Sequence, residues 1–193
     1  DEKMYEELLE QAKLNNFPNI IKAYHYTVTK SGIIPSTSFT IENKEKKDSV
    51  LVKDLRQIMK TSSCAVWSCI WKKSFLDKYN LFFRKEINNS SDVLFTWQAF
   101  IYNKEILLVF KPYYYYNLST PSSVTRGLNK KFLDFIKVFN HQKNFLKEQN
   151  VYSDFETAFQ TRAYSHYSYA FRRALLIRGL RFHRYFELKQ FFD

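Results

Sequence analysis

Glycine is nearly absent from this chain. Only Gly32, Gly127 and Gly179 occur in 193 residues, and they lie far apart. Domains that bind a nucleotide by themselves place glycines where the backbone approaches phosphate, as in the Rossmann and P-loop motifs. This sequence contains no such loop. If the protein acts on a nucleotide, we expect the phosphate-binding part to lie outside these residues.

Length and composition indicate one folded domain, or part of a larger one. Hydrophobic residues make up 45% of the chain and charged residues 25%, which excludes the disordered and low-complexity classes. The longest aliphatic and aromatic run, Ile106 to Phe110, is far shorter than the ~18 residues that span a bilayer. No apolar leader follows Asp1, and Cys64 and Cys69 are too few for a disulfide framework. We therefore expect a cytoplasmic protein.

The chain is strongly basic. Thirty Lys and Arg residues against 19 Asp and Glu give a formal net charge of +11. This excess predicts an anionic partner, which is nucleic acid, anionic lipid or a phosphorylated small molecule. Nucleic-acid binders concentrate basic residues around exposed aromatic residues. Here the tryptophan and tyrosine clusters have only Lys72, Lys73 and Lys111 nearby, so the distribution disfavours nucleic acid.

Apolar spacing predicts both strands and helices in the first two thirds of the chain and helices alone after that. This order is typical of an α/β fold with a helical C-terminal cap. Pro112 is expected to divide the second predicted strand into a pair. The predicted helices cover 1–15, 50–59, 74–79, 91–102, 129–149, 153–178 and 182–192, and the predicted strands cover 19–29 and 105–117, with a hairpin at 30–41.

Five short motifs follow one another in the middle of the chain: V-W-S-C-I-W-K-K-S-F-L at 66–76, N-L-F-F at 80–83, S-D-V-L-F at 91–95, Y-Y-Y-Y-N at 113–117 and S-S-V-T-R at 122–126. Their order and spacing resemble the acceptor-binding half of family-2 glycosyltransferases of the GT-A fold, over most of residues 1–127.

The resemblance implies the C-terminal half of a GT-A-like mixed sheet over 1–128 and a helical extension over 129–193. It also implies an activity, in which an inverting enzyme moves a sugar from a nucleotide-sugar donor to a glycan or lipid-linked acceptor. The expected setting is the synthesis of bacterial surface polysaccharide.

Asp92 is the residue to which the resemblance assigns catalysis. Inverting transfer needs a carboxylate that takes the proton of the acceptor hydroxyl, and the aspartate of the family's E-D motif has that role. Ser91 stands where the family commonly has glutamate. The alternative is that Ser91 and Asp92 only cap a helix, as such residues often do.

The resemblance also points to substrate-binding residues. Trp67 and Trp71, followed by Lys72, are candidates for lining an acceptor cleft, although large aromatic residues are more often core. Tyr115 belongs to a run in which at most half of the rings can face a site, because strand side chains alternate. Arg126, in a Ser/Thr-rich loop, is suited to hold a diphosphate, with an ordinary surface arginine as the alternative. We place Trp97 in the core.

No metal site is recognisable in the sequence. The histidines do not cluster, and no two aspartates stand two positions apart. The family uses an Asp-x-Asp motif to hold a divalent metal, Mn or Mg, against the donor diphosphate. The resemblance therefore implies a metal whose ligands lie outside this chain, in a preceding nucleotide-binding half. We expect these 193 residues alone not to catalyse transfer.

The C-terminal stretch 171–193 carries six Lys or Arg residues against two acids, interleaved with Phe and Leu. Such a helix suits an anionic membrane surface, which would place the protein on the inner face of the cell membrane. Packing on the domain with extended arginines is the alternative. For the chain as a whole, the alternative to a glycosyltransferase is a non-catalytic basic binding module for nucleic acid or anionic membrane.

Overall fold

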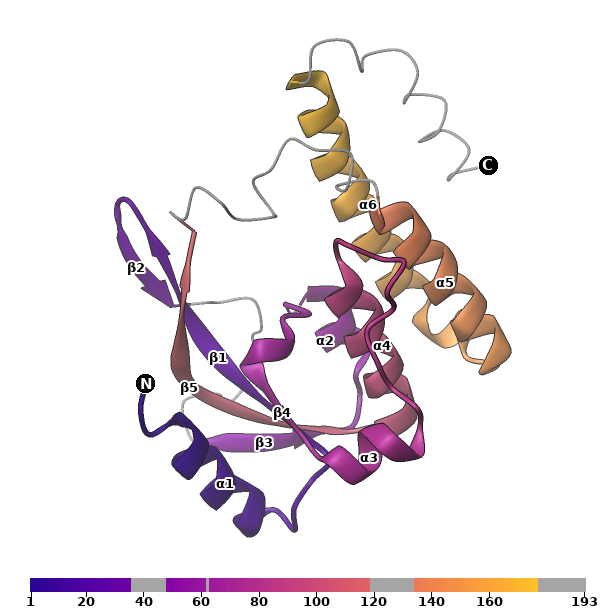
Figure 1. The fold of residues 1–193 in the computed structure, drawn as a ribbon. Coiled ribbons are helices and arrows are strands. Elements are labelled where there is room, and N and C mark those ends of the chain that lie inside the picture. Colours follow the sequence, from indigo (N-terminus) through magenta and orange to yellow (C-terminus); the bar gives the residue numbers. More distant parts are fainter. Residues whose placement is uncertain (36–47, 62, 119–133, 177–193) are drawn as a thin grey trace.

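The computed structural model describes residues 1–35, 48–61, 63–118 and 134–176, and it shows an α/β fold with C-terminal helices (Figure 1). A mixed sheet has one helix below it and a group of helices at its other side. The elements in chain order are α1 (Met4–Leu14), β1 (Ile20–Thr29), β2 (Gly32–Pro35), β3 (Ser49–Val52), α2 (Arg56–Thr61), the 3-10 helix η2 (Val66–Ser68), β4 (Cys69–Trp71), α3 (Lys73–Lys78), α4 (Ser91–Asn103), β5 (Ile106–Asn117), α5 (Asp134–Glu148) and α6 (Tyr152–Leu176).

The two long strands β1 and β5 run parallel and form the centre of the sheet, whose strand order is β2-β1-β5-β3. The other edge of β1 has two antiparallel partners. Residues Ile20 to Lys22 pair with β4, and Tyr26 to Thr29 pair with β2 in the hairpin that the sequence predicts. Since η2 directly precedes β4, it lies beside the middle of β1, between these two partners.

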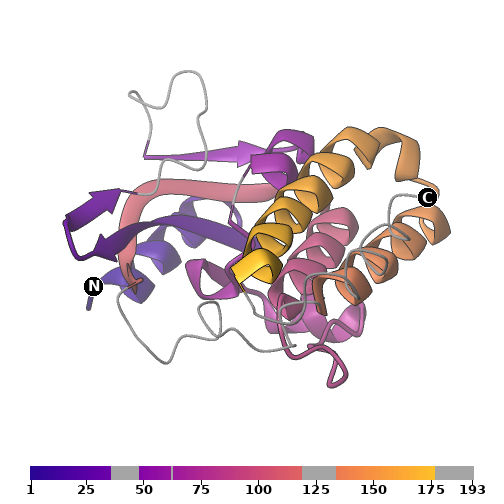
Figure 2. The same ribbon diagram turned by 90° about the horizontal axis from the view of Figure 1, so that it is seen from above.

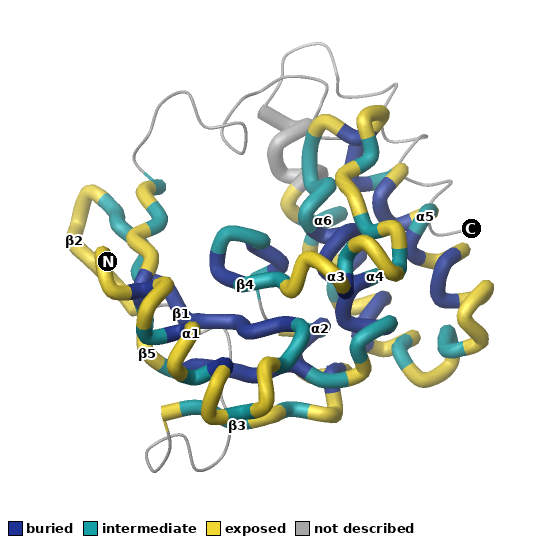
Figure 3. Tube along the Cα trace, turned by 60° about the horizontal axis from the view of Figure 1, so that its bottom comes forward, coloured by how far each residue is buried: buried dark blue, intermediate teal, exposed yellow. Residues whose placement is uncertain are grey.

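The core has two parts, one on each face of the sheet. Below the sheet, Met4, Leu8 and Ala12 recur every four residues on α1 and pack against β1 and β5. On the other face, α4, α5 and α6 pack together, as Figure 2 shows from above. The buried positions in Figure 3 accordingly run along β1 and β5, between α1 and this helical group.

One predicted helix is wrong. Residues 50–59, whose apolar spacing suggests a helix, form β3 and then α2. β3 pairs antiparallel with β5, so that Val50 lies opposite Leu108 and Val52 opposite Ile106. Both valines pack against the helical core. Strand pairing with a distant segment therefore outweighs the local spacing, and β-branched valine suits a strand.

The strand pair predicted around Pro112 is also wrong, because β5 is a single strand from Ile106 to Asn117. Pro112 lies where the register between β1 and β5 shifts, on both sides of Tyr24. Proline lacks a main-chain N–H and is tolerated at such irregularities. The chain therefore continues past Pro112 without turning.

The remaining predicted helices at 1–15, 74–79, 91–102, 129–149 and 153–178 correspond to α1, α3, α4, α5 and α6, within a few residues at each end. The predicted helix at 182–192, and with it most of the basic C-terminal stretch, lies outside the described residues. No helix in the part of the chain that the structure describes has both the length and the apolar character that crossing a membrane requires.

Candidate functional site

The N-terminus of α4 presents Asp92. The preceding Ser90 has a left-handed backbone with φ of 62°, and its side chain makes no capping hydrogen bond. The Oδ1 atom of Asp92 accepts a hydrogen bond of 2.9 Å from the main-chain N–H of Val93. Burial raises the pKa of the Asp92 carboxyl, although main-chain N–H groups and the positive charge of Arg162 act in the opposite direction. A carboxylate with a raised pKa is a stronger base at neutral pH.

Helix α6 carries Arg162, whose positive charge acts on the Asp92 carboxyl. The Nη2 atom of Arg162 lies 3.2 Å from the Sγ atom of Cys64. The main-chain carbonyl of Cys64 accepts a hydrogen bond of 2.9 Å from the hydroxyl of Thr96, which lies one helical turn after Asp92 on α4. Helices α4 and α6 therefore both contact the start of one short segment, residues 64–69, which we call the Trp67 segment.

An aromatic platform, formed by Trp67, Tyr114 and Tyr116, lies further along the Trp67 segment. The Trp67 ring stacks on Tyr114 with a centroid distance of 4.3 Å and on Tyr116 with one of 5.2 Å. The ring of His25 meets Trp67 edge to face at 4.9 Å. Tyr114 and Trp67 are both partly accessible. Accessible stacked rings with hydroxyl groups can bind a flat, partly apolar ligand face such as that of a sugar.

The sheet irregularity explains why His25 reaches this platform. Ala23 packs on the α1 side of the sheet, and simple alternation would send His25 to that same side. The register shifts on both sides of Tyr24 change the alternation, and His25 contacts Trp67 instead. Burial lowers the pKa of His25, and the charge of Lys22 lowers it further.

Lys22 is a buried cation under the Trp67 segment. Its Nζ atom donates a hydrogen bond of 2.8 Å to the Ser68 hydroxyl and lies 4.0 Å from the Sγ atom of Cys69. The Ser68 hydroxyl in turn donates 2.7 Å to the carbonyl of Ala65. Burial raises the pKa of the Cys69 thiol, so this sulfur remains a neutral neighbour of the ammonium group.

The other predicted site residues lie in different surroundings. Trp71 packs edge to face on Phe95 at 5.1 Å, and its indole N–H donates 3.2 Å to the carbonyl of Val66. Lys72 is exposed at the start of α3. Tyr115 is 51% exposed and stacks on Tyr26. Trp97 is buried, as predicted.

The tyrosine run alternates as the sequence predicts. Tyr113 lies on the α1 side, where its hydroxyl donates 2.8 Å to Glu7, and Tyr115 shares this side of the strand. Tyr114 and Tyr116 lie on the side of Trp67. The structure thus brings Asp92 and Trp67 to two ends of one arrangement and separates Tyr115 from it. Arg126 lies outside the described residues.

Sequence reasoning missed five residues of this arrangement. The alternation rule predicts that Tyr114 and Tyr116 share one face of the strand, but it does not say which face of the run lies at the site. Lys22, His25 and Arg162 carried no sequence signal, because their places depend on the bulge in the sheet and on the packing of α6.

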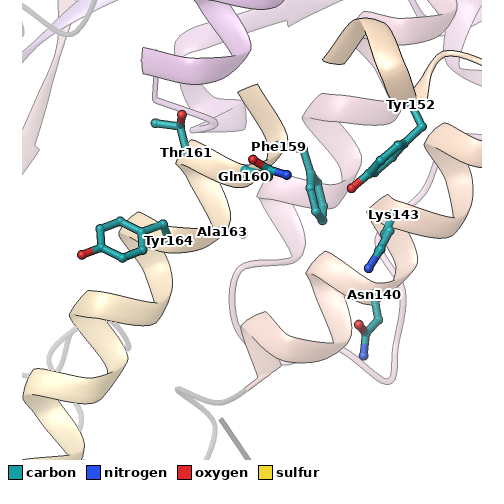
Figure 4. Close-up of a pocket in the computed structure, with 8 residues that line it drawn as sticks. All are labelled: Asn140, Lys143, Tyr152, Phe159, Gln160, Thr161, Ala163 and Tyr164. Atoms are coloured by element: carbon teal, nitrogen blue, oxygen red, sulfur yellow. The ribbon is translucent and has the colours of Figure 1, made fainter. Parts of the chain in front are cut away.

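A hollow with a volume of 540 Å³ is lined by residues of α5 and α6. Figure 4 shows the hydroxyl end of Tyr152 directed toward the ring of Phe159, which is buried together with Ala163. None of the described residues that line this hollow belongs to the five motifs. It is therefore separate from the candidate site.

The described ranges contain no group of three or more His, Cys, Asp or Glu side chains arranged to hold a metal ion. The sequence matches no protein-family model, and a search of curated proteins finds no relative.

Proposed function

We propose that this chain is the acceptor-binding half of an inverting glycosyltransferase, with Asp92 as the general base and the aromatic platform as the seat of the acceptor sugar. The observation that carries the proposal is the hydrogen bond from Thr96 to the carbonyl of Cys64. It joins the helix that presents Asp92 to the Trp67 segment. The two bonded residues directly adjoin or lie near the motifs 66–76 and 91–95, and Trp71 of the first motif packs on Phe95 of the second.

In the proposed reaction, the acceptor hydroxyl attacks the anomeric carbon of the donor sugar. A new C–O bond forms there, the bond from the sugar to the nucleotide diphosphate breaks, and the hydroxyl proton passes to the Asp92 carboxylate. The raised pKa of Asp92 supports this role. Stacking on Trp67 would orient the acceptor ring, because a bound ring presents only certain hydroxyl groups to the base.

The nucleotide-sugar donor and a divalent metal, Mn or Mg, remain predictions from the resemblance. The described residues offer no set of metal ligands, and the steps above involve only Asp92 and the platform. The lipid-linked nature of the acceptor and its place in surface polysaccharide synthesis are likewise proposals.

Saccharide binding tests the proposal on the full chain. Tryptophan fluorescence and calorimetry are measured against a panel of oligosaccharides. We expect Trp67→Ala to abolish binding and Tyr115→Ala to retain it, because Tyr115 is an exposed aromatic residue on the other face of β5. Loss of binding in both variants, or in neither, would contradict the platform.

Transfer is the second test, in a preparation that is active with nucleotide sugars. Asp92→Asn should keep saccharide binding and reduce turnover at least ~100-fold, because an amide cannot accept the proton. Unchanged turnover would remove Asp92 as the base. Binding of anionic vesicles or of single-stranded RNA, with no binding of any saccharide, would instead favour the basic binding module.

A further inference from the structure

The charge of Lys22 is the least expected feature near the platform. Lys22 is only 5% exposed, in the middle of the central strand β1. An ammonium group has three N–H donors, and within the described part of the chain its strong acceptor is the Ser68 hydroxyl. Because the Sγ atom of Cys69 is a weak acceptor at 4.0 Å, most of the donor capacity of Lys22 is unused.

Lys22 also has no acidic partner among the residues that the structure describes. The ion pairs among the described residues involve Arg56, Lys73, Arg84, Lys111 and Lys137, and none includes Lys22. Burying an ammonium group without a carboxylate partner is unfavourable, because the protein interior replaces the solvation by water only in part. Such an arrangement suggests that the missing negative charge comes from a ligand.

The place of Lys22 indicates where that ligand would sit. Ser68, its hydrogen-bond partner, follows Trp67 directly in η2. His25, three residues further along β1, packs against Trp67, and its pKa responds to the charge of Lys22. The positive charge therefore lies beneath the platform, where low-dielectric surroundings extend its influence.

The other end of the Trp67 segment differs. There Arg162 contacts Cys64, and its positive charge acts on the Asp92 carboxyl. Among the described residues, the platform end therefore has a cation with no acid paired to it, whereas the α4 end has a cation and an acid. A bound molecule would meet a positive field at the platform and a carboxylate at the reacting hydroxyl.

We infer that the ligand of the platform is an acidic saccharide, whose carboxylate or phosphate group lies toward Lys22 while a hydroxyl group lies toward Asp92. This inference rests on the proposed function and narrows its acceptor to anionic glycans. It also implies that the acceptor lies along the Trp67 segment, with its acidic group at the Lys22 end and its reacting hydroxyl at the Asp92 end.

The test compares matched oligosaccharides on the full chain: a neutral one, the same one with a carboxylate, and the same one with a phosphate monoester. We expect at least one of the anionic forms to bind roughly tenfold tighter than the neutral form, equivalent to about 1.4 kcal/mol. The preference should shrink as salt is raised. The two anionic ligands distinguish a sugar acid from a sugar phosphate.

Two variants assign the preference to one residue. Lys22→Met keeps a long apolar stem without charge, and should bring the ratio of anionic to neutral affinity close to one. Lys73→Met removes an exposed lysine paired with Asp77 and should keep the wild-type ratio. Lys22→Arg, which retains the charge, should keep a preference for the anionic forms and serves if the methionine variant does not fold.

The outcomes separate the two proposals. Equal affinity for neutral and anionic forms in the wild type, with binding still dependent on Trp67, overturns the acidic acceptor and leaves the platform standing. A preference that survives Lys22→Met overturns the role of Lys22. If no saccharide binds at all, both the acidic acceptor and the proposed function fail.

Discussion

The hydroxyl of Thr96 donates a hydrogen bond of 2.9 Å to the main-chain carbonyl of Cys64, a residue 32 positions earlier in the chain. Both residues are buried. This bond connects the helix that presents Asp92 to the segment that carries Trp67, and the packing of Trp71 on Phe95 of the same helix supports the same placement.

Thr96→Val should therefore destabilise the protein. Valine has nearly the shape of threonine but leaves the Cys64 carbonyl without its donor, which costs about 1–3 kcal/mol of unfolding free energy for a buried group. Thr61→Val is the matched control, because the Thr61 hydroxyl bonds to the Gln57 carbonyl at an exposed position of its own helix. Urea unfolding measures both. A loss in Thr61→Val equal to that in Thr96→Val would contradict the structural role of the buried bond.

Asp92→Asn should raise the melting temperature at neutral pH. Folding raises the pKa of Asp92, so the folded state disfavours the charged form. Asparagine keeps an oxygen that can accept the bond from the Val93 N–H. The gain should be present above the raised pKa and should disappear as the pH falls toward the ordinary aspartate value, where wild-type Asp92 is itself protonated. Calorimetry at several pH values measures it.

Asp77→Asn is the control for that experiment, since Asp77 is exposed and paired with Lys73. Its melting temperature should stay near the wild-type value or fall slightly. A lower melting temperature for Asp92→Asn would mean that the carboxylate stabilises the fold and that its burial is compensated.

The protein should lose stability in weak acid. Burial lowers the pKa of both His25 and His166 below the ordinary value of 6.5. The unfolded chain then binds more protons than the folded chain, so the free energy of unfolding decreases as the pH falls from about 6.5 through the lowered values. The double variant His25→Gln with His166→Gln should flatten this dependence, and His141→Gln should keep it. A wild-type stability that is constant from pH 7.5 to 5 would exclude the effect.

Leu8 and Leu9 test how α1 docks on the sheet. Leu8 is fully buried, whereas its neighbour Leu9 is 49% exposed. Leu8→Ala should cost about 3 kcal/mol of unfolding free energy, because it leaves a cavity under the sheet, and Leu9→Ala should change stability by at most about 0.5 kcal/mol. Chemical denaturation measures the free energy of unfolding of both variants. Similar losses in both would place a different face of α1 on the sheet.

Several features of the fold follow from local sequence pattern. Apolar residues at three- and four-residue intervals predict α1 and α4 to within a few residues, because one face of each helix packs on the core. The strict alternation of the tyrosine run predicts two opposite faces. The α/β class follows from the order of the elements, and the buried position of Trp97 follows from its place on the apolar stripe of α4.

The edge strand β3 and the surroundings of His25, Arg162 and Lys22 were decided by the tertiary structure. Residues 49–52 form a strand because β5 offers them partners more than fifty positions away, which no local window contains. The bulge at Tyr24 sends His25 to the platform, and the packing of α6 brings Arg162 to Cys64. From the sequence alone, Lys22 is an ordinary strand lysine. It is buried, with no acidic partner among the described residues, because the Trp67 segment covers β1 through a long-range contact.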